Sequence, residues 1–415
     1  MAIAARASSR VCSIPVSLRK DCRGGVAPLV ALAIIPLIAS VGCAVDFSRA
    51  VALRTAMQGA LDSTALTLAG QDGKSLDQAQ QIFLASFAHP EVQGLSVAGE
   101  TDDTSGKVTV SVTASGSVKT EFMSLMGFEN LPLKVKATAS KTRDDSGCVL
   151  ALDTTASGAI SNGGSTTTTL SNCSVYSNSN SAAAVSVGGS ATLTARSIGT
   201  VGKASLSGNV ITTDGIRTGL FPISDPYYDA TYPSFSGCTQ THLNVNKSTT
   251  IDPGVYCDGL TVNAGATLTL NPGIYYIDRG SFSVNGGATI NGQGVTLVFT
   301  SSTGANWATA TINGNASVNL TAPIGGPTAG IVVFGDRQIP TGTAFKFNGG
   351  SNQYLGGAVY VPTGAISYAG GSSSSTSCTK IIGGTVNFTG NSNLAINCTS
   401  YPTKSFGETV VRLES

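Results

Sequence analysis

The first pattern in the chain is a run of twenty residues, 26–45, that holds no charged side chain and is mostly apolar. At 1.5 Å per residue, a helix of this length is about 30 Å long, which matches the hydrocarbon core of a bilayer. The preceding residues carry excess positive charge. Asp21 alone is set against Arg6, Arg10, Arg19, Lys20 and Arg23. This asymmetry predicts a transmembrane helix, with residues 1–25 in the cytoplasm and the rest of the chain exported.

Three processed forms compete with a retained anchor. A cleavable signal peptide has the same basic start and apolar core, although no A-x-A site follows here. A lipidated form would begin at Cys43, but Ser40 stands where such signals carry leucine. A prepilin would be cut after Gly25, and Val30 occupies the position of its glutamate. The pattern favours the retained anchor.

Residues 46–143 combine helical and strand periodicities. The stretch 46–69 is predicted to be a helix, partly buried on its own domain and partly a stalk that continues the membrane helix. Its predicted apolar face holds Phe47, Val51, Met57, Leu61 and Leu68. A second helix is expected over 76–87, and "KVTVSVT" and "LKVKATA" alternate as strands with one buried face. We therefore expect a small membrane-proximal α+β unit.

The stretch "RGGVAPLVALAIIPLIASVGCAVDFSRAVALRTAMQGALDSTALTLAG" resembles the N-terminus of TadG-like proteins of the Tad (Flp) pilus assembly system. A glycine pair before the apolar run, an Ala-Val-Asp exit at Asp46 and an Ala-rich helix carry this resemblance, which covers residues 20–143. It implies a bacterial cell-envelope protein with one membrane segment, and partners among other Tad pilus or envelope proteins. Val30 in place of glutamate fits the uncleaved members of the family.

A different pattern, a recurring phrase, begins after residue 147. It reads "SVGGSATLT" at 186–194, "TVNAGATLT" at 261–269, "SVNGGATIN" at 283–291 and "TINGNASVN" at 311–319. Each copy is a short alternating strand, a turn in which Gly or Asn supplies a positive φ, and a second strand. Such repeats predict a mostly β domain over 147–400, a right-handed parallel β-helix (solenoid), followed by a tail over 401–415. Asn-Gly hairpin signals leave a β-sandwich as the alternative fold.

Composition narrows the partners and the compartment. Charged residues make up 11% of the chain and the net charge is +1, so the composition gives no electrostatic case for nucleic acid, which requires a clustered basic face. Six cysteines in the β region indicate disulfides in an oxidising compartment, with buried free thiols as the alternative. Pairing by sequence neighbours predicts Cys148–Cys173, Cys238–Cys257 and Cys378–Cys398.

One short motif raises the question of a metal site. Asp153, Thr155 and Ser157 form D-x-T-x-S, which resembles the metal-binding D-x-S-x-S of von Willebrand factor A-type domains that other TadG-like proteins carry. There, a carboxylate and two hydroxyls hold a hard cation. That fold needs amphipathic helices between its strands, and residues 158–220 offer none. A turn leaving the first strand is therefore the preferred interpretation, and no metal or cofactor is predicted.

Solenoids also house polysaccharide lyases and hydrolases, which need paired carboxylates or a base beside calcium. The candidates here are Asp252, Asp258, Asp278, Asp336, Arg279 and Arg337. Two Asp–Arg pairs, 278–279 and 336–337, each follow an apolar strand, where adjacent charges commonly solvate the strand end. No nucleophile-elbow or phosphate-loop motif occurs, so the chain is predicted not to be an enzyme.

The remaining interruption of the repeats is "DPYYDATYPSF" at 225–235, interpreted as a cap over one end of the solenoid rather than a contact patch. Together these features predict a single-pass protein of the bacterial inner membrane with most of its chain in the periplasm or outside the cell. Its expected role is structural or adhesive and linked to Tad/Flp pilus assembly, and in the adhesive form its ligand is a carbohydrate or another surface group. The alternative is an exported carbohydrate-binding or polysaccharide-cleaving β-helix protein.

Overall fold

The computed structural model describes residues 26–71, 76–104, 107–143, 145–350, 352–371 and 377–414. The chain forms two compact units, each described here by itself. Unit 1 comprises Met1–Thr142 with Val411–Ser415, and unit 2 comprises Arg143–Val410. The predicted cytoplasmic segment, 1–25, lies outside the described residues.

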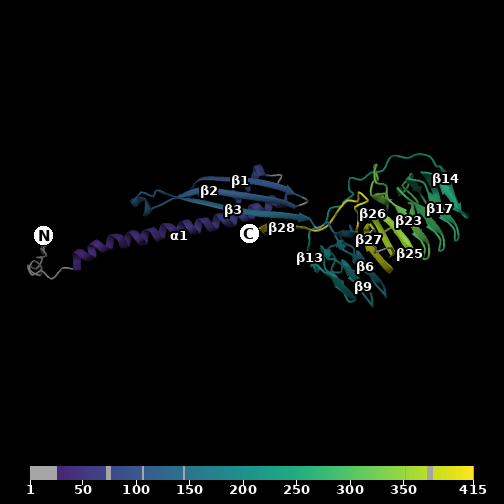
Figure 1. The fold of residues 1–415 in the computed structure, drawn as a ribbon, viewed down its shortest axis with the longest axis horizontal. Helices are drawn as coiled ribbons and strands as arrows, with labels where there is room; N and C mark the ends of the chain where they lie inside the picture. The colour runs from purple at the N-terminus through teal and green to yellow at the C-terminus, as the bar shows by residue number, and fades with distance from the viewer. Residues whose placement is uncertain are drawn as a thin grey trace, which may run out of the picture. The chain divides into compact units, whose positions relative to one another are not determined.

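Unit 1 is a long helix packed on a four-stranded sheet with the strand order β1-β2-β3-β28 (Figure 1). Strand β2 pairs antiparallel with both β1 and β3. The helices are α1 (Val26–Gly70), η2 (Leu76–Gln78), α2 (Ala79–Ser86) and η3 (Met123–Met126). The strands are β1 (Val92–Thr104), β2 (Lys107–Lys119), β3 (Asn130–Arg143) and β28 (Thr409–Glu414). The expected tail over 401–415 therefore ends in a strand of this sheet, because β28 supplies its fourth member.

Helix α1 runs without a break through the expected boundary at residue 45. Its second half forms the core of unit 1, where Met57, Leu61 and Leu68 are fully buried against the sheet and α2. Phe47 and Val51 were expected on the same face, yet both are exposed. The buried apolar side chains instead begin with Ala50 and Leu53, which continue the spacing of three and four residues back from Met57 and so stay on the side of the helix that meets the sheet.

The described residues of unit 2 form twenty-four strands, β4 to β27, in one hydrogen-bonded system. The first group is β4 (Gly147–Ala151), β5 (Ile160–Asn162), β6 (Thr167–Ser171), β7 (Ser174–Ser177), β8 (Val185–Val187), β9 (Thr192–Ala195), β10 (Ile198–Thr200), β11 (Ala204–Leu206), β12 (Asn209–Thr212) and β13 (Ile216–Thr218). The second group is β14 (Gln240–Val245), β15 (Thr249–Ile251), β16 (Gly254–Val262), β17 (Thr267–Leu270), β18 (Gly273–Asp278), β19 (Ser281–Val284), β20 (Thr289–Gly292), β21 (Val295–Thr300), β22 (Thr309–Ile312), β23 (Ser317–Thr321), β24 (Ile331–Gly335), β25 (Ala344–Gly350), β26 (Gln353–Gly370) and β27 (Thr379–Ala395).

The strands of unit 2 stack in parallel, and the chain returns to each stack after three strands. Thus β18 pairs with β21, β19 with β22 and β20 with β23, all in parallel. The recurring phrase is the corner between two stacks: Val284 ends β19, Gly287 turns with φ 79°, and Ile290 lies in β20. Val284 and Ile290 are buried inside the stack. The predicted parallel coiling is present, whereas a sandwich would need antiparallel neighbours.

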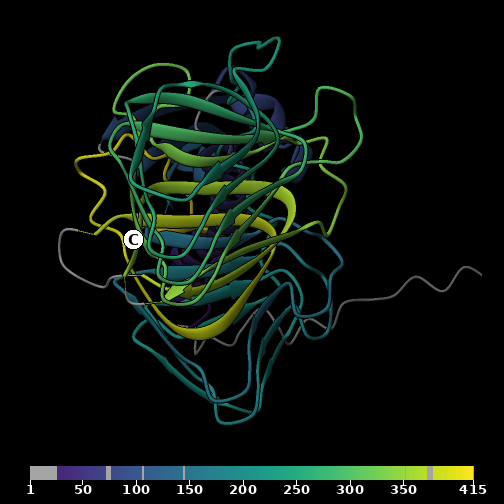
Figure 2. The ribbon, with the colours of Figure 1, turned by 90° about the vertical axis from the view of Figure 1, so that its right-hand side faces the viewer.

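The chain enters this stack in its middle. Strand β27 pairs in parallel with β26 on one side and with β4, β5 and β6 on the other. The chain therefore winds outward from β4 to β13, crosses to β14 at the opposite end, and winds back to β27. Figure 2 shows this order, with the yellow-green strands of β26 and β27 between green strands and blue-teal strands.

The crossing segment, residues 219–239, is called the strap. It follows the side of the stack and covers a row of outward-facing apolar side chains. These share one register across successive strands and are Val255, Tyr276, Val298, Phe334, Tyr360, Ile382, Leu150 and Tyr176. The expectation of a cap over one end was therefore wrong, because the apolar surface that the strap buries lies along the side of the stack.

Candidate functional site

The apolar part of α1 is the first candidate functional surface, because its side chains are exposed although they are large and apolar. Leu32 is 77% exposed and Ile35 is 69% exposed. Among the described residues, only the helix over Val30–Gly70 is long and apolar enough to cross a membrane. Exposed aliphatic side chains at this density are unfavourable in water and favourable in hydrocarbon. The helix fits a single-pass membrane anchor.

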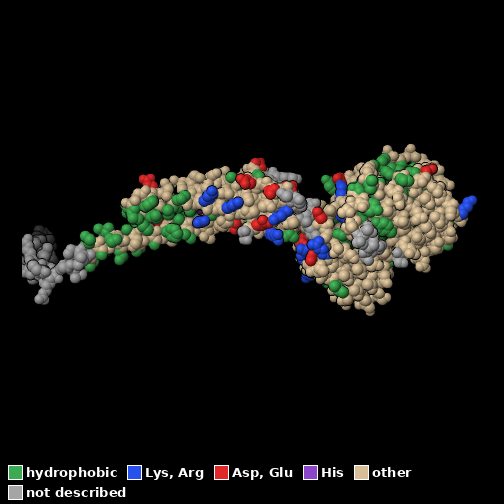
Figure 3. All heavy atoms as spheres, viewed as in Figure 1, with side chains coloured by type: hydrophobic (Ala, Val, Ile, Leu, Met, Phe, Trp, Pro, Cys, Tyr) green, Lys and Arg blue, Asp and Glu red, His purple; other side chains and the backbone are tan. Residues whose placement is uncertain are grey.

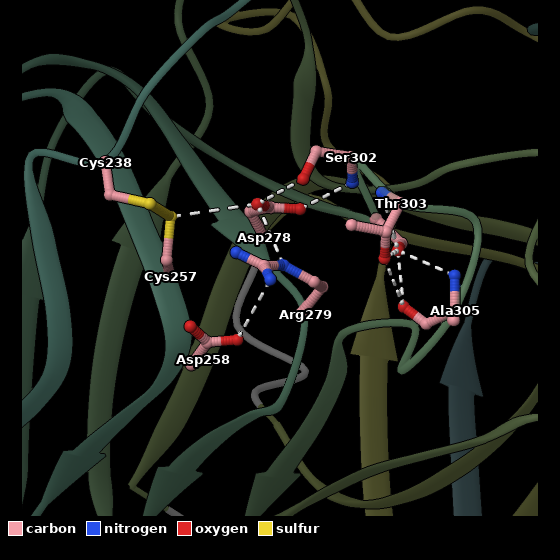
Figure 4. A network of polar contacts seen from close by, with 9 residues as sticks. Cys238, Cys257, Asp258, Asp278, Arg279, Ser302, Thr303 and Ala305 are labelled. Carbon is pink, nitrogen blue, oxygen red and sulfur yellow. Dashed lines mark hydrogen bonds and ion pairs between the residues drawn. A yellow bond between two sulfur atoms is a disulfide. The ribbon is translucent and has the colours of Figure 1, made fainter.

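The second candidate site is the corner of unit 2 that holds Asp278, drawn in Figure 4. Asp278 ends β18 and its carboxylate is buried. Ser302 donates to it twice, from the backbone N–H to Oδ1 (2.6 Å) and from the hydroxyl to Oδ2 (2.8 Å). Arg279 Nε donates to Oδ2 at 3.2 Å, and its guanidinium also lies 3.5 Å from Asp258 Oδ1. A sulfur of the Cys238–Cys257 disulfide is 3.7 Å from the same Oδ2.

Asp336 occupies the equivalent corner position two strands further along the stack. Register aligns Asp278 with Thr300, and the Thr300 hydroxyl donates to Asp336 Oδ2 at 2.8 Å. Tyr232 of the strap donates to the same oxygen at 2.6 Å, and Gln338 N–H donates to Oδ1 at 2.9 Å. Both candidate carboxylates are thus occupied as hydrogen-bond acceptors for the protein's own groups.

Arg337 also serves the strap. Its guanidinium donates to the backbone carbonyl oxygens of Ala230, at 3.0 Å, and Tyr227. Its Cζ lies 5.5 Å from the ring centroid of Tyr360. The last enzyme candidate, Asp252, is exposed and accepts from Asn271 Nδ2 at 2.6 Å. The two Asp–Arg pairs therefore play different parts: 278–279 closes a corner, and 336–337 fastens the strap.

The strap meets successive levels of the stack in the order of its own sequence. Near its start, Ile223 exchanges two hydrogen bonds with Asn178, just after β7. Asp225 accepts from the Tyr360 hydroxyl at 2.7 Å in β26. Near its end, the ring of Phe235 stacks on Tyr276 of β18, and the Cys238–Cys257 disulfide fixes it to β16.

Burial along this row changes the acidity of its tyrosines. Burial, with a smaller contribution from the hydrogen bond to Asp336, raises the pKa of Tyr232 to about 12. Burial likewise raises the pKa of Tyr227 to about 12. Burial and the neighbouring Asp225 carboxylate raise the pKa of Tyr360. All three hydroxyls are therefore protonated near neutral pH. Those of Tyr232 and Tyr360 donate to carboxylates, and that of Tyr227 accepts from the Lys404 N–H at 3.0 Å.

A second segment, 401–408, completes the cover of the apolar row. Phe406 packs into the same cluster, and its carbonyl oxygen accepts from Gly147 N–H at 3.0 Å. Lys380 is buried beneath this segment, where its ammonium donates to the Lys404 carbonyl at 3.0 Å and lies 5.5 Å from the Phe406 ring centroid. Burial lowers the pKa of Lys380 to about 8, although Asp145 opposes the shift.

The D-x-T-x-S motif forms a turn after β4. Asp153 Oδ1 accepts from the backbone N–H groups of Thr155 and Ala156, each at 2.8 Å, and from the Thr155 hydroxyl at 3.3 Å. Ser157 is exposed. Among the described residues, no group of three or more His, Cys, Asp or Glu side chains is placed to hold a metal ion.

Three disulfides join the six cysteines of unit 2. They are Cys148–Cys173, Cys238–Cys257 and Cys378–Cys398, the same pairs that the sequence order predicts. The second pair has a particular position, because Cys238 is at the end of the strap and Cys257 is in β16 beside Asp278.

Comparison with known families bears on unit 1. Residues 24–72 match the family model described as Putative Flp pilus-assembly TadE/G-like. This segment is TadE/G-like. The match spans the exposed apolar part of α1 and its buried continuation, which is the N-terminal part of the resemblance noted over residues 20–143. No curated protein and no solved structure matches the chain. A Tad pilus-assembly segment with an N-terminal apolar helix indicates a membrane-anchored, pilus-associated protein that interacts with other pilus or envelope components.

Sequence reasoning overlooked several partners that hold these sites together. Asp46 and Lys380 are buried charged residues whose partners come from segments far away in the chain, so no local spacing signals them. Ser302 is a similar case, since it follows β21 while its acceptor ends β18. One signal was available: "DG" at 258–259 interrupts an apolar run within β16 and "RG" at 279–280 follows the apolar strand β18, a pattern that is typical of a tight corner.

Proposed function

We propose that this chain is a single-pass protein of the bacterial inner membrane with a structural role in a Tad/Flp pilus system. The observation that carries the proposal is α1 itself. Its first part presents exposed apolar side chains, its second part is the core of unit 1, and the TadE/G-like match covers both. A continuous helix of this kind transmits the position of the membrane directly to a folded unit.

The proposed orientation places residues 1–25 in the cytoplasm and both units outside it. The excess of Arg and Lys before the apolar run supports this direction of insertion. The three disulfides support a periplasmic or extracellular location for unit 2, because such bonds persist in oxidising compartments.

For unit 2 we infer a right-handed β-helix that serves as a rigid projecting body. Parallel strands joined by crossovers are right-handed in nearly all proteins. Structural use is favoured over catalysis because the carboxylates of Asp278 and Asp336 accept hydrogen bonds from the protein's own groups. In this proposal the chain is not an enzyme, and adhesion to a carbohydrate or another surface ligand is a form that the structural role could take.

The test is the mature N-terminus and cell fraction of the full chain carrying a C-terminal tag. We expect a product that begins before Arg23, stays in the membrane pellet after alkaline carbonate washing, and loses its tag when protease is added to spheroplasts. A chain that begins after Gly25 would mean pilin-like processing. One that begins near Cys43 would mean a released or lipidated protein, and either result would contradict the proposal.

A role in pilus assembly requires a second readout. Deletion of the gene is expected to reduce surface pili, and the full chain is expected to restore them. A variant with Leu32, Ile35 and Leu37 replaced by Lys should fail to restore pili because it cannot enter the membrane. Normal piliation in the deletion strain would contradict a role in the Tad system.

A further inference from the structure

The loop between β2 and β3, residues 120–129, is called the tip, and it is fastened to α1. The Asp46 carboxylate accepts from three consecutive backbone N–H groups: Glu121 at 3.1 Å, Phe122 at 2.8 Å and Met123 at 2.7 Å. These donors precede or begin η3, so the buried carboxylate satisfies groups that a helix start leaves unpaired. The tip is therefore held at a fixed place beside the helix.

A glycine in α1 makes this contact close. A side chain added at Gly42 would place its Cβ 2.5 Å from Cγ of Phe122, nearer than real Cβ atoms approach. Gly42 therefore lets the ring of Phe122 lie directly on the helix backbone. The fastening thus has two parts, one polar at Asp46 and one apolar at Gly42, a single helical turn apart.

The tip then presents large apolar side chains to its surroundings. Leu125 is 86% exposed, Phe128 59%, Met126 50% and Phe122 42%. Four such residues within seven positions form a concentrated apolar surface, and monomeric soluble proteins seldom expose one without a use for it. Figure 3 shows green side chains gathered at this end of the sheet beside α1.

This surface continues the exposed apolar surface of α1. Next to Gly42, the helix exposes Ile38, Val41 and Val45 to a similar degree. Gly42 lies four residues before Asp46, where the uncharged run ends, so the tip contacts the helix about 6 Å inside the end of that run. Charged groups follow at once, since Arg49 Nη1 lies 3.9 Å from Glu121 Oε1. The tip thus follows the same order as the helix: Phe122 lies against the apolar part of α1 at Gly42, and Glu121 lies beside the charged part at Arg49.

We propose that the tip inserts Phe122, Leu125, Met126 and Phe128 into the boundary of the bilayer where α1 emerges. The occupant of this apolar surface is lipid, because the surface is continuous with the helix face that lipid covers. Shallow insertion of this kind reaches roughly 5–10 Å into the boundary between head groups and acyl chains. The proposal rests on the proposed function, in which α1 spans the membrane. Two points of attachment, unlike one, fix the height and tilt of unit 1 on the membrane.

The test uses the full chain in vesicles of phosphatidylethanolamine and phosphatidylglycerol whose acyl chains are brominated near the head group. Trp307 is the single tryptophan, so Trp307→Phe provides a background free of tryptophan. Leu125→Trp is then added to report on the tip. We expect the fluorescence of this tryptophan to be much weaker in brominated vesicles than in vesicles of unbrominated lipid. We also expect its emission maximum to lie at a shorter wavelength than that of a tryptophan exposed to water.

Two matched leucines serve as controls on the same background. Leu37→Trp reports on α1 and should be quenched if the helix enters the membrane. Leu413→Trp should stay bright, because Leu413 is exposed beside Glu414, which pairs with Lys107 at the end of β2 opposite the tip. The 13 residues of β2 separate these ends by about 40 Å.

The outcomes are distinguishable. Quenching of both Leu37→Trp and Leu125→Trp supports the insertion of the tip. Quenching of Leu37→Trp with a bright Leu125→Trp overturns it while leaving the anchor intact, and a tip that binds another protein would give this result. A bright Leu37→Trp overturns the anchor and the tip together. Phe128→Trp, which keeps an aromatic ring, repeats the measurement should Leu125→Trp fail to fold.

Discussion

At the scale of single residues, Asp278 shows how a candidate catalytic acid can instead be a structural one. Its buried carboxylate accepts two hydrogen bonds from Ser302 and one from Arg279. Asp278→Asn replaces one acceptor oxygen by a donor that faces these donors. We expect a loss of about 2 kcal/mol in the free energy of unfolding, since hydrogen bonds to charged groups contribute roughly 1.5–3 kcal/mol.

The measurement is urea unfolding of the full chain in detergent, followed by the fluorescence of Trp307, which packs against the core of unit 2. Asp252→Asn is the matched control, because Asp252 is exposed and should change stability by no more than about 0.5 kcal/mol. Equal stability of the two variants would contradict the structural role of Asp278.

Lys380 gives a prediction about pH. Its pKa in the folded chain, about 8, lies below the ordinary value of 10.5 because the ammonium is buried. Between these two values the unfolded chain holds a proton that the folded chain has lost, so stability rises with pH across this window. The destabilisation is fully present below about pH 8. Relative to Lys380→Met, the wild-type chain should gain up to about 3 kcal/mol between pH 8 and 10.5.

Comparison with a methionine variant is necessary because other groups titrate nearby. The raised pKa values of Tyr227 and Tyr232 lower stability as pH rises above about 10, but they do so equally in both chains. Lys346→Met is the control, since Lys346 is exposed on β25. If the free energy of unfolding changed with pH in the same way for the wild type and Lys380→Met, burial of the Lys380 ammonium would not destabilise the folded chain.

At the scale of elements, the sequence patterns correctly predicted the features that interactions between neighbouring residues determine. Period-two alternation and Gly/Asn corners gave the strands and the parallel coiling, because each repeat carries its own turn and its own inward-facing residues such as Val284 and Ile290. The strap was placed wrongly for the converse reason. Its partners, including Tyr360 and Asp336, lie more than 100 residues away, and only the assembled stack forms the apolar row that it covers.

The candidate sites divide in the same way. The apolar run of α1 could be predicted because length and the absence of charge decide membrane entry residue by residue. The tip could not be predicted as a functional surface, because its position beside α1 depends on Asp46, which lies 75 residues before Glu121 in the chain. The Asp–Arg pairs could be recognised in the sequence, but their different roles could not. Those roles depend on Ser302, which donates to Asp278, and on Tyr232, which donates to Asp336, and only the fold brings these partners together.

The disulfide at the end of the strap gives the prediction at this scale. Removing it with Cys238→Ala and Cys257→Ala should cost about 3 kcal/mol for a loop of this length and free the strap's last residues. Chymotrypsin is then expected to cut first within 227–235, as mass spectrometry of the fragments would show. The control is Cys378→Ala with Cys398→Ala, which removes a loop of nearly equal length elsewhere. The same cleavage pattern in both variants would contradict the fastening role.

At the scale of the whole molecule, the path of the chain makes the strap the link between two groups of strands. Strands β4–β13 and β14–β27 are wound separately and meet where β27 pairs with β4, β5 and β6. The strap is the one covalent connection between these two groups, since each described disulfide lies within a single group or joins the strap's end to it. Residues 409–414 also return to the sheet of unit 1 as β28.

This arrangement predicts that unit 2 survives cutting of the strap. A recognition site for a specific protease can be inserted after Tyr228, which is 75% exposed. Cleavage there would divide the chain into two fragments with no covalent bond between them. We expect the fragments to co-elute in gel filtration in mild detergent and to separate only in urea, at the midpoint of the Trp307 transition. The buried row and the β27–β4 pairing hold them, because apolar burial contributes roughly 25 cal/mol per Å².

A shortened chain separates the two contributions to this association. Ending the chain after Glu408 removes β28 from the sheet of unit 1 and leaves the pairing of β27 with β4 intact. The cut, shortened chain should still co-elute if the stack is continuous through its middle. Separation of the fragments in mild detergent would mean that β28 and the strap, rather than the strand pairing at the centre of the stack, keep unit 2 in one piece.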